Sequence, residues 1–179
     1  MADQFDLVIV GGGPGGYAAA FYGASAGLSV ALVEKDTIGG TCLNRGCIPA
    51  KAFLETAAAR RHAEHANEFG IATVVGDTNF ATAQARKQKI VDGLVKGLTG
   101  LVKVKKVTYL LGVGSLNADN SVTVTATDGA VSRISGRNVV LAAGSVPRTF
   151  PGFEPGGPIM TSDEVLMLDR IPQRIAVIG

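Results

Sequence analysis

The feature that most constrains the fold is a glycine-rich turn near the amino terminus, set between two apolar runs. Residues 5–10 (FDLVIV) are mostly apolar and rich in β-branched side chains, which is typical of a strand covered on both faces. The turn over residues 11–16 follows directly and satisfies the pattern G-x-G-x-x-G. We expect an alanine-rich helix over residues 17–26, with Gly27 as its C-cap. A second apolar strand over residues 28–33 completes a βαβ unit.

The glycines of this turn each have a physical reason. Gly11 permits the tight turn, Gly13 lets the backbone approach a pyrophosphate, and Gly16 lets the helix pack closely on the strand. The helix N-terminus offers unpaired N–H groups and the positive end of its dipole to a phosphate. Glu34 lies 18 residues after Gly16, near the spacing of about 20 for a carboxylate that binds the adenosine ribose and disfavours a 2′-phosphate. The pattern predicts a dinucleotide site, and a turn used only for packing is the alternative.

The two cysteines of the chain, Cys42 and Cys47, lie five positions apart within residues 39–51. A disulfide between them closes a loop too small to give much chain-entropy stabilisation, so stability is a poor reason for the pair. Cys47 stands just before Pro49, where a helix can begin, and the N-terminus of a helix favours the reactive thiolate. The segment therefore predicts a redox-active dithiol.

Two other uses of the cysteines stay open at this point. Buried cysteine is common as a small, inert hydrophobic residue. A zinc site is the other alternative, because His62 and His65 follow the cysteines. The spacings C-x4-C and H-x2-H depart from the usual zinc-finger spacings, so we expect both histidines on the surface of a helix and no metal site.

Composition narrows the classes of partner. The chain has 179 residues, of which 46% are hydrophobic and 18% charged, so it can build a core and disorder is not expected. A net charge of +2, sparse aromatics and no tryptophan argue against nucleic-acid binding. Without a signal peptide or an apolar stretch of about 20 residues, we expect no membrane partner and a cytoplasmic location. There a paired dithiol is more often catalytic than structural.

The rest of the chain predicts a mixture of helices and strands. Helices are expected over about residues 48–68 and over residues 82–101, the second weakened at its end by three glycines. Residues 107–141 alternate apolar and polar side chains between turn signals, which indicates an antiparallel β-meander. Residues 139–143 form a buried-type strand, and residues 151–158 are rich in glycine and proline, as in a loop.

Together these motifs resemble the class I pyridine nucleotide–disulfide oxidoreductases. The family pattern G-G-T-C-L-N-x-G-C-I-P-S-K matches residues 39–51 except at Ala50, where serine is usual. Residues 142–148 are also similar, although Ala143 stands where the family has threonine. The cysteine segment is most similar to that of the dihydrolipoamide dehydrogenase subfamily, the flavoprotein components of 2-oxo acid dehydrogenase complexes. Glutathione-type and mercuric-type reductases are the alternatives within the family.

This resemblance implies an α/β fold: a Rossmann-like FAD-binding domain with a parallel sheet, an active-site helix and an antiparallel β-meander. Cys42 is expected to exchange with the dithiol substrate, and Cys47 to face the flavin. Dihydrolipoamide would be oxidised to lipoamide through the Cys42–Cys47 disulfide and FAD, with NAD+ as acceptor. The residues expected to bind FAD are Gly11, Gly13, Pro14, Gly15, Gly16, Glu34, Lys35, Gly40, Thr41, Lys51, Val113, Gly114, Ala143, Gly144 and Ser145.

The domain organisation is also predicted from this resemblance. Residues 1–150 are expected to form the FAD-binding domain with the dithiol, and residues 151–173 a connecting loop and short helix. Residues 174–179 repeat the pattern of residues 6–11, as the first strand of an NAD-binding domain would. We therefore expect the N-terminal portion of a longer homodimeric enzyme whose partner is dihydrolipoamide or a lipoyl domain. A non-catalytic fragment that binds FAD or an adenine nucleotide is the alternative.

Overall fold

The computed structural model describes residues 3–178, apart from the side chain of residue 3. The elements are β1 (Asp3–Val10), α1 (Pro14–Ser25), β2 (Val30–Glu34), α2 (Gly40–Arg45), α3 (Cys47–His65), the 3-10 helix η1 (Ala66–Phe69), α4 (Phe80–Val104), β3 (Thr108–Leu116), β4 (Ser121–Ala126), β5 (Val131–Leu141) and α5 (Ser162–Val165). The chain forms two compact units. The first contains the residues up to Asn44 and Gly93–Val146, and the second contains Arg45–Asp92 and the residues from Pro147 onward.

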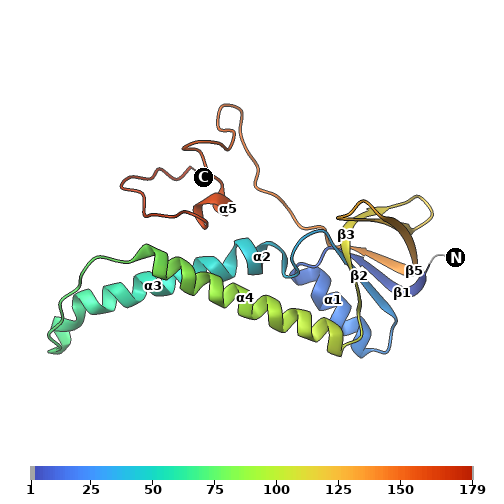
Figure 1. Ribbon diagram of the computed structural model, residues 1–179, viewed down its shortest axis with the longest axis horizontal. Coiled ribbons are helices and arrows are strands. Elements are labelled where there is room, and N and C mark those ends of the chain that lie inside the picture. The colour runs from blue at the N-terminus through green and yellow to red at the C-terminus, as the bar shows by residue number, and fades with distance from the viewer. Residues whose placement is uncertain (1–2, 179) are drawn as a thin grey trace. The chain divides into compact units, whose positions relative to one another are not determined.

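In the first unit the five strands close into a barrel (Figure 1). β1 pairs in parallel with β2 and β5, and β2 pairs in parallel with β3. β4 pairs antiparallel with β3 and β5. The start of β3, residues 108–111, pairs with β2, and residues 112–116 pair with β4. The expected parallel sheet and the expected meander are therefore parts of one closed sheet.

Side-chain alternation along β1 builds two hydrophobic clusters, one on each face of the barrel wall. Val8 and Val10 belong to a cluster that contains only strand residues, whereas Ile9 belongs to a cluster that also contains Ala20 of α1 and Val102 of α4. Successive strand residues point to opposite faces, so the first cluster fills the barrel and the second lies under the helices. This explains the nearly continuous apolar run of residues 5–10.

Helix α1 begins at Pro14, three residues before the expected start. Proline suits the first helical position because its fixed φ is already helical and its missing N–H would have had no partner there. The helix ends as expected, since Gly27 follows the C-cap with φ +83°. Gly16, Ala20 and Gly23 are its buried residues, and their small size lets the helix lie close to the sheet.

Helix α4 is longer than expected, and its three glycines do not end it. In an isolated helix Gly93, Gly97 and Gly100 are unfavourable by about 1 kcal/mol each. A side chain built at any of them meets nothing within 4 Å. On this part of the helix, however, Val102 belongs to the second cluster, under the helices, and Val95 and Leu98 pack against it. Tertiary packing outweighs the low helix propensity.

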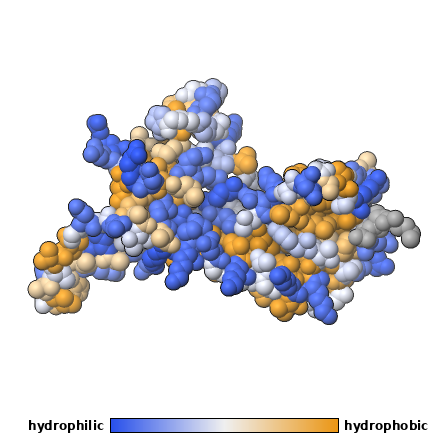
Figure 2. Space-filling view, in the orientation of Figure 1, coloured by the Kyte–Doolittle hydropathy of each residue, from blue (hydrophilic) through white to orange (hydrophobic). Residues whose placement is uncertain are grey.

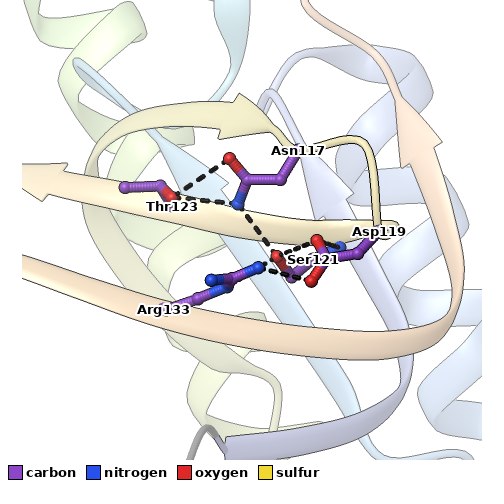
Figure 3. Close-up of polar contacts among 5 residues, drawn as sticks. All are labelled: Asn117, Asp119, Ser121, Thr123 and Arg133. Atoms are coloured by element: carbon purple, nitrogen blue, oxygen red, sulfur yellow. Dashed lines mark hydrogen bonds and ion pairs between the residues drawn. The ribbon is translucent and has the colours of Figure 1, made fainter.

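The meander end of the barrel is closed by a polar network (Figure 3). The Ser121 hydroxyl, 4% exposed as a residue, accepts from Asn117 Nδ2 at 2.9 Å and Arg133 Nε at 2.8 Å, and donates to Asp119 Oδ1 at 2.7 Å. Arg133 also pairs with Asp119, and Asn117 donates to Thr123 Oγ1 at 3.0 Å. Hydrogen bonds from the Ser121 side chain and backbone hold the pKa of Asp119 below its usual value. The network ties the β3–β4 turn to β5.

In the second unit, α3 packs along the start of α4 (Figure 1). The rings of Phe53 and Phe80 stack with their centroids 5.5 Å apart, and Arg86 donates to the Ala52 carbonyl at 3.0 Å. Helix α3 ends at His65, slightly earlier than expected, because the chain tightens into η1. Figure 2 shows apolar side chains gathered where this hairpin turns. Phe69, Ile71 and Val74 are exposed there.

The two histidines lie on the surface of α3, as predicted. His65 Nδ1 lies 2.9 Å from Glu68 Oε1. Within residues 3–178, no helix is long and apolar enough to span a membrane.

At the carboxyl end, the expected first strand of a further domain stays a prediction. Over residues 174–178 the structure assigns neither helix nor strand, and Gly179 lies outside the described residues. An extended segment becomes a strand only when a neighbouring strand supplies hydrogen bonds, and none of the described strands pairs with it. The predicted domain boundaries stay predictions, and the two compact units divide residues 1–150 differently.

Candidate dinucleotide site and cysteine segment

The carboxyl ends of three parallel strands meet at one edge of the barrel in the first unit. Gly11 follows β1, and its N–H donates to the Val33 carbonyl of β2 at 2.8 Å. Ala142 follows β5, and its N–H donates to the Val10 carbonyl of β1 at 2.8 Å. Ligands of parallel α/β sheets bind outside the carboxyl ends of the strands. This edge, which we call the glycine edge, is therefore the candidate site.

The glycines of the first turn divide into two kinds. Gly11 has φ +109°, and a Cβ there would lie 2.1 Å from the Ala142 carbonyl oxygen. A Cβ at Gly16 would lie 1.7 Å from the Gly11 carbonyl oxygen. At Gly13 and Gly15 the nearest atoms would be 3.7 and 4.0 Å away. The fold requires glycine at the first pair of positions, whereas beside the backbone of the second pair there is space for a Cβ at ordinary van der Waals distance.

Helix α1 points its N-terminus at this space. Gly13 is the N-cap, no side chain caps the helix, and no acidic residue stands in its first turn. The first N–H groups of a helix have no partner within the helix, and together with the dipole they favour an anion. The arrangement is suited to a phosphate group.

A second glycine segment packs directly against the first turn. The Gly39 N–H donates to the Gly12 carbonyl at 2.8 Å. Gly40 has φ +59°, and a Cβ there would lie 2.6 Å from Gly13 Cα. Because α2 begins at Gly40, this contact brings the helix that carries half-buried Cys42 beside the glycine-rich turn of residues 11–16.

Asn44 holds this second segment, and sequence reasoning missed its role. Its Nδ2 lies 3.2, 3.2 and 3.1 Å from the carbonyl oxygens of Thr37, Ile38 and Gly40. A single side-chain amide thus fixes the loop that leads into α2. The only sign of this role in the sequence is a polar amide among small residues. Helix α2 has six residues and is too short to show a helical period.

Glu34 lies at the same edge, 9% exposed, at the end of β2. Its Oε2 accepts from the Gly12 N–H at 2.6 Å and its Oε1 from the Asp36 N–H at 2.9 Å. A carboxylate oxygen has two lone pairs, so each can still accept a ribose hydroxyl. Tyr109 lies nearby, its hydroxyl 3.5 Å from the Asp36 carbonyl oxygen. Burial, and then the carboxylates of Glu34 and Asp36, raise the pKa of Tyr109 to about 12, so the phenol is a neutral donor.

The other predicted contacts in this unit are placed as follows. A Cβ at Gly114 would lie 2.9 Å from a Val10 methyl and 3.2 Å from a Val33 methyl, so the β3 backbone passes over the ends of β1 and β2. The neighbouring Val113 is 53% exposed. The structure thus gathers residues 11–16, Glu34, Gly40 and Gly114 at the glycine edge. Five further predicted residues of this unit are exposed: Lys35, Thr41, Ala143, Gly144 and Ser145.

Cys47 and Lys51 lie in the second unit. Cys47 is the first residue of α3, with Gly46 as the N-cap, so the predicted helix start is confirmed. Cys47 and Lys51 are exposed, and Pro49 between them is buried.

Two further findings limit the choice of site. No group of three or more metal-ligand side chains (His, Cys, Asp or Glu) occurs within the described residues. A cavity of about 630 Å³ lies among residues 155–169 in the second unit and is lined by Ile159, Met160 and Met167, among others. It contains none of the predicted site residues, so the glycine edge is the better candidate.

A glycine edge of this kind, followed by a paired-cysteine segment, defines a class of flavoprotein. The family model described as pyridine nucleotide-disulphide oxidoreductase matches residues 5–179. The chain therefore belongs to the pyridine nucleotide-disulphide oxidoreductase family, and the predicted family is confirmed.

Individual relatives make the similarity more specific. Over its whole length the chain is 41% identical to the dihydrolipoyl dehydrogenase of Chlamydia pneumoniae and 40% identical to that of Bacillus subtilis. It covers 38% and 40% of those two proteins, so it spans about two fifths of the length of these curated relatives. The crystal structure of LpdA from Mycobacterium tuberculosis matches 96% of this chain and 38% of LpdA, with a TM-score of 0.86 and 26% identity. The predicted α/β fold class is confirmed.

Proposed function

We propose that the glycine edge binds FAD and that the chain is the flavin-binding and dithiol portion of an enzyme that oxidises dihydrolipoamide. The observation that carries the proposal is the contact of residues 39–40 with residues 12–13, at 2.8 Å between Gly39 N and Gly12 O. This contact places the helix of Cys42 beside the turn suited to a pyrophosphate. The names of the relatives from Chlamydia pneumoniae and Bacillus subtilis support the substrate.

The residues at the glycine edge fit the dinucleotide part of FAD. The first N–H groups of α1 would bind the pyrophosphate, which the absence of side chains at Gly13 and Gly15 would let approach the backbone. Glu34 would accept the adenosine ribose hydroxyls, and the backbone at Val113 and Gly114 would meet the adenine. Contacts nearer the flavin ring are proposed for Lys35, Thr41, Lys51, Ala143, Gly144 and Ser145. When bound, FAD supplies an acceptor for two electrons.

The cysteines exchange with the dithiol substrate in two steps. A substrate thiolate attacks Cys42 Sγ of the Cys42–Cys47 disulfide, which forms a mixed disulfide and releases Cys47 as a thiolate. The second substrate thiolate then attacks the substrate sulfur of the mixed disulfide, and Cys42 is released. The substrate leaves as a cyclic disulfide, and its two electrons stay on the cysteine pair. Cys47, the thiol released in the first step, is the first residue of α3.

The remaining parts of the reaction are proposed for a protein of the relatives' full length. There NAD+ is the final acceptor, the working form is a homodimer, and the partner is dihydrolipoamide or a lipoyl domain. The cytoplasmic location stays a prediction from the sequence.

An anaerobic titration tests the proposal. The purified chain is loaded with FAD and mixed with dihydrolipoamide, and bleaching of the flavin absorbance is followed. The unsubstituted chain should bleach, whereas Cys42→Ser and Cys47→Ser should each abolish bleaching because neither can form the disulfide. Ser25→Ala, far from the cysteines in sequence, is the control. Bleaching that survives in both cysteine variants contradicts the dithiol role.

A further inference from the structure

A lysine is buried in the second unit among groups that do not neutralise it. Lys87 of α4 is 3% exposed. Its Nζ lies 3.2 Å from the Leu166 carbonyl oxygen, 3.6 Å from Met167 Sδ and 5.9 Å from the centre of the Phe53 ring. Burial lowers the pKa of Lys87, and the charge of Asp92 opposes that shift. Burying an ammonium is unfavourable unless hydrogen bonds compensate. The burial of Lys87 at this position therefore needs an explanation, and its contacts are where to look for one.

The contacts of Lys87 join three separate pieces of chain. Phe53 belongs to α3, six residues after Cys47. Leu166 and Met167 belong to the turn that follows α5. Gln84, one helical turn before Lys87, donates from Nε2 to the Leu166 carbonyl at 3.3 Å and also to the Leu168 carbonyl. Two side chains of α4 therefore hold the carbonyl groups of residues 166–168.

The other end of α5 reaches the cysteine segment. Thr161 and Glu164 form a capping box that fixes the start of α5. On the first turn of α5, Asp163 Oδ2 lies 3.8 Å from Arg45 Nε. Arg45 stands two residues before Cys47. The segment 161–168 is thus attached to α4 at one end and to the residue before the N-cap of α3 at the other.

We propose that Lys87 is a positioning residue for Cys47, which it orients through Phe53 on α3 and through the α5 segment and Arg45. The proposal rests on the redox role of Cys47 proposed above. Replacing a buried charge by an apolar side chain of similar size is often neutral or stabilising. Global stability therefore gives no reason for an ammonium at this position. A reason for the ammonium is its hydrogen bond to the Leu166 carbonyl, because a hydrogen bond fixes a direction and an apolar contact does not.

Lys87→Met in the 179-residue chain tests the proposal, with Lys89→Met, an exposed lysine on the same helix, as the matched control. Amide hydrogen exchange is measured over residues 47–53 and 161–168. The rate of alkylation of Cys47 by iodoacetamide is measured in a Cys42→Ser background. Loss of one hydrogen bond to a charged group should raise exchange in both segments about tenfold and change the alkylation rate about threefold or more. Lys89→Met should change neither.

Faster exchange in residues 161–168 alone, with unchanged exchange in residues 47–53 and unchanged alkylation of Cys47, would overturn the proposal. Lys87 would then hold only the local turn. Asp163→Asn acts at the far end of the same connection and keeps the question open to test if Lys87→Met does not fold. It should raise exchange over residues 47–50, and no change there contradicts the proposal.

Combining the two substitutions sharpens the result, because groups that act through one connection are not additive. Over residues 47–50, the amide exchange rate of the double variant should exceed that of the faster single variant by less than about twofold. Effects that multiply would show independent roles and overturn the proposal. Exchange and alkylation need neither flavin nor dihydrolipoamide, so their outcome is separate from that of the flavin titration.

Discussion

The two ends of β1 meet opposite surroundings in the same barrel. At the carboxyl end, the glycine edge leaves the first N–H groups of α1 without a side-chain cap and leaves space beside Gly13 and Gly15. At the amino end, β1 pairs with β5 from Ile134 onward, directly after Arg133 and its network with Ser121. In the described residues no buried side-chain nitrogen or oxygen lacks a partner. One end is closed by side chains and stabilises the barrel, and the other keeps backbone donors available for a ligand.

The largest expected effect on stability is at Gly16, where α1 packs directly against the backbone of Gly11. Gly16→Ala should lower the free energy of unfolding by about 3 kcal/mol or more, because the new Cβ would overlap the Gly11 carbonyl and force backbone shifts. Urea denaturation of the chain without flavin measures this change.

Gly15→Ala, one residue earlier in the same helix, is the matched control. Its Cβ would have 4.0 Å of clearance, and alanine favours a helix by about 1 kcal/mol over glycine, so stability should not fall. Equal losses at both positions would contradict the division of the glycines into two kinds.

The next largest effect on stability is expected in the polar network around Ser121, near the amino end of β1. Ser121→Ala should cost about 1–3 kcal/mol of unfolding free energy, because it removes the buried hydroxyl that accepts from Asn117 and Arg133 and donates to Asp119. The affinity for FAD should not change. Thermal denaturation and flavin fluorescence measure the two quantities.

Ser132→Ala, an exposed serine on β5, is the control for this substitution and should change neither quantity. A loss of FAD affinity in Ser121→Ala would show that the two ends of the barrel are coupled.

The smallest effect is a dependence of stability on pH. Hydrogen bonds from Ser121 lower the pKa of folded Asp119 below the value of 3.8, so the folded state favours the carboxylate. This contribution is present above pH 3.8 and is lost as the pH falls through the folded pKa. Asp119→Asn should therefore flatten the decline of stability below about pH 4, measured by unfolding at several pH values. An unchanged acid slope would contradict the assignment.

The local elements of the fold could be predicted from the sequence. The βαβ unit, the start of α3 at Cys47 and the exposed histidines follow from apolar periodicity, glycine positions and helix-start signals. The closed barrel was not predicted, because it depends on the pairing of β3 with β2 and of β5 with β1. These strands are distant in sequence, and pairing of that kind has no local signal. The glycines of α4 were misjudged as weakening its end, because the packing of Val95, Leu98 and Val102 on the barrel outweighs propensity.

The candidate site shows the same division. The residues of the glycine-rich turn were found by spacing alone. Asn44 was not, because its role depends on three carbonyl groups that converge only when residues 37–40 fold around it. Lys87 was not found either, because a lysine on a helix reads as a solvent-exposed residue, and only the fold shows that it is buried.

The affinity of the chain for FAD tests the central claim most directly. Gly13→Val places a side chain where the pyrophosphate is proposed to approach the turn. The backbone there has φ −73°, which any residue adopts, and the new Cβ would lie 3.7 Å from Gly40 Cα. Gly76→Val introduces the same side chain in the second unit, where a Cβ meets nothing within 4 Å. Quenching of flavin fluorescence gives the dissociation constant of each variant. We predict that Gly13→Val, in a variant that urea denaturation shows to be folded, weakens FAD binding by more than about tenfold, at least 1.4 kcal/mol. We predict that Gly76→Val binds FAD like the unsubstituted chain. Unchanged affinity in Gly13→Val would contradict the assignment of the glycine edge as the FAD site.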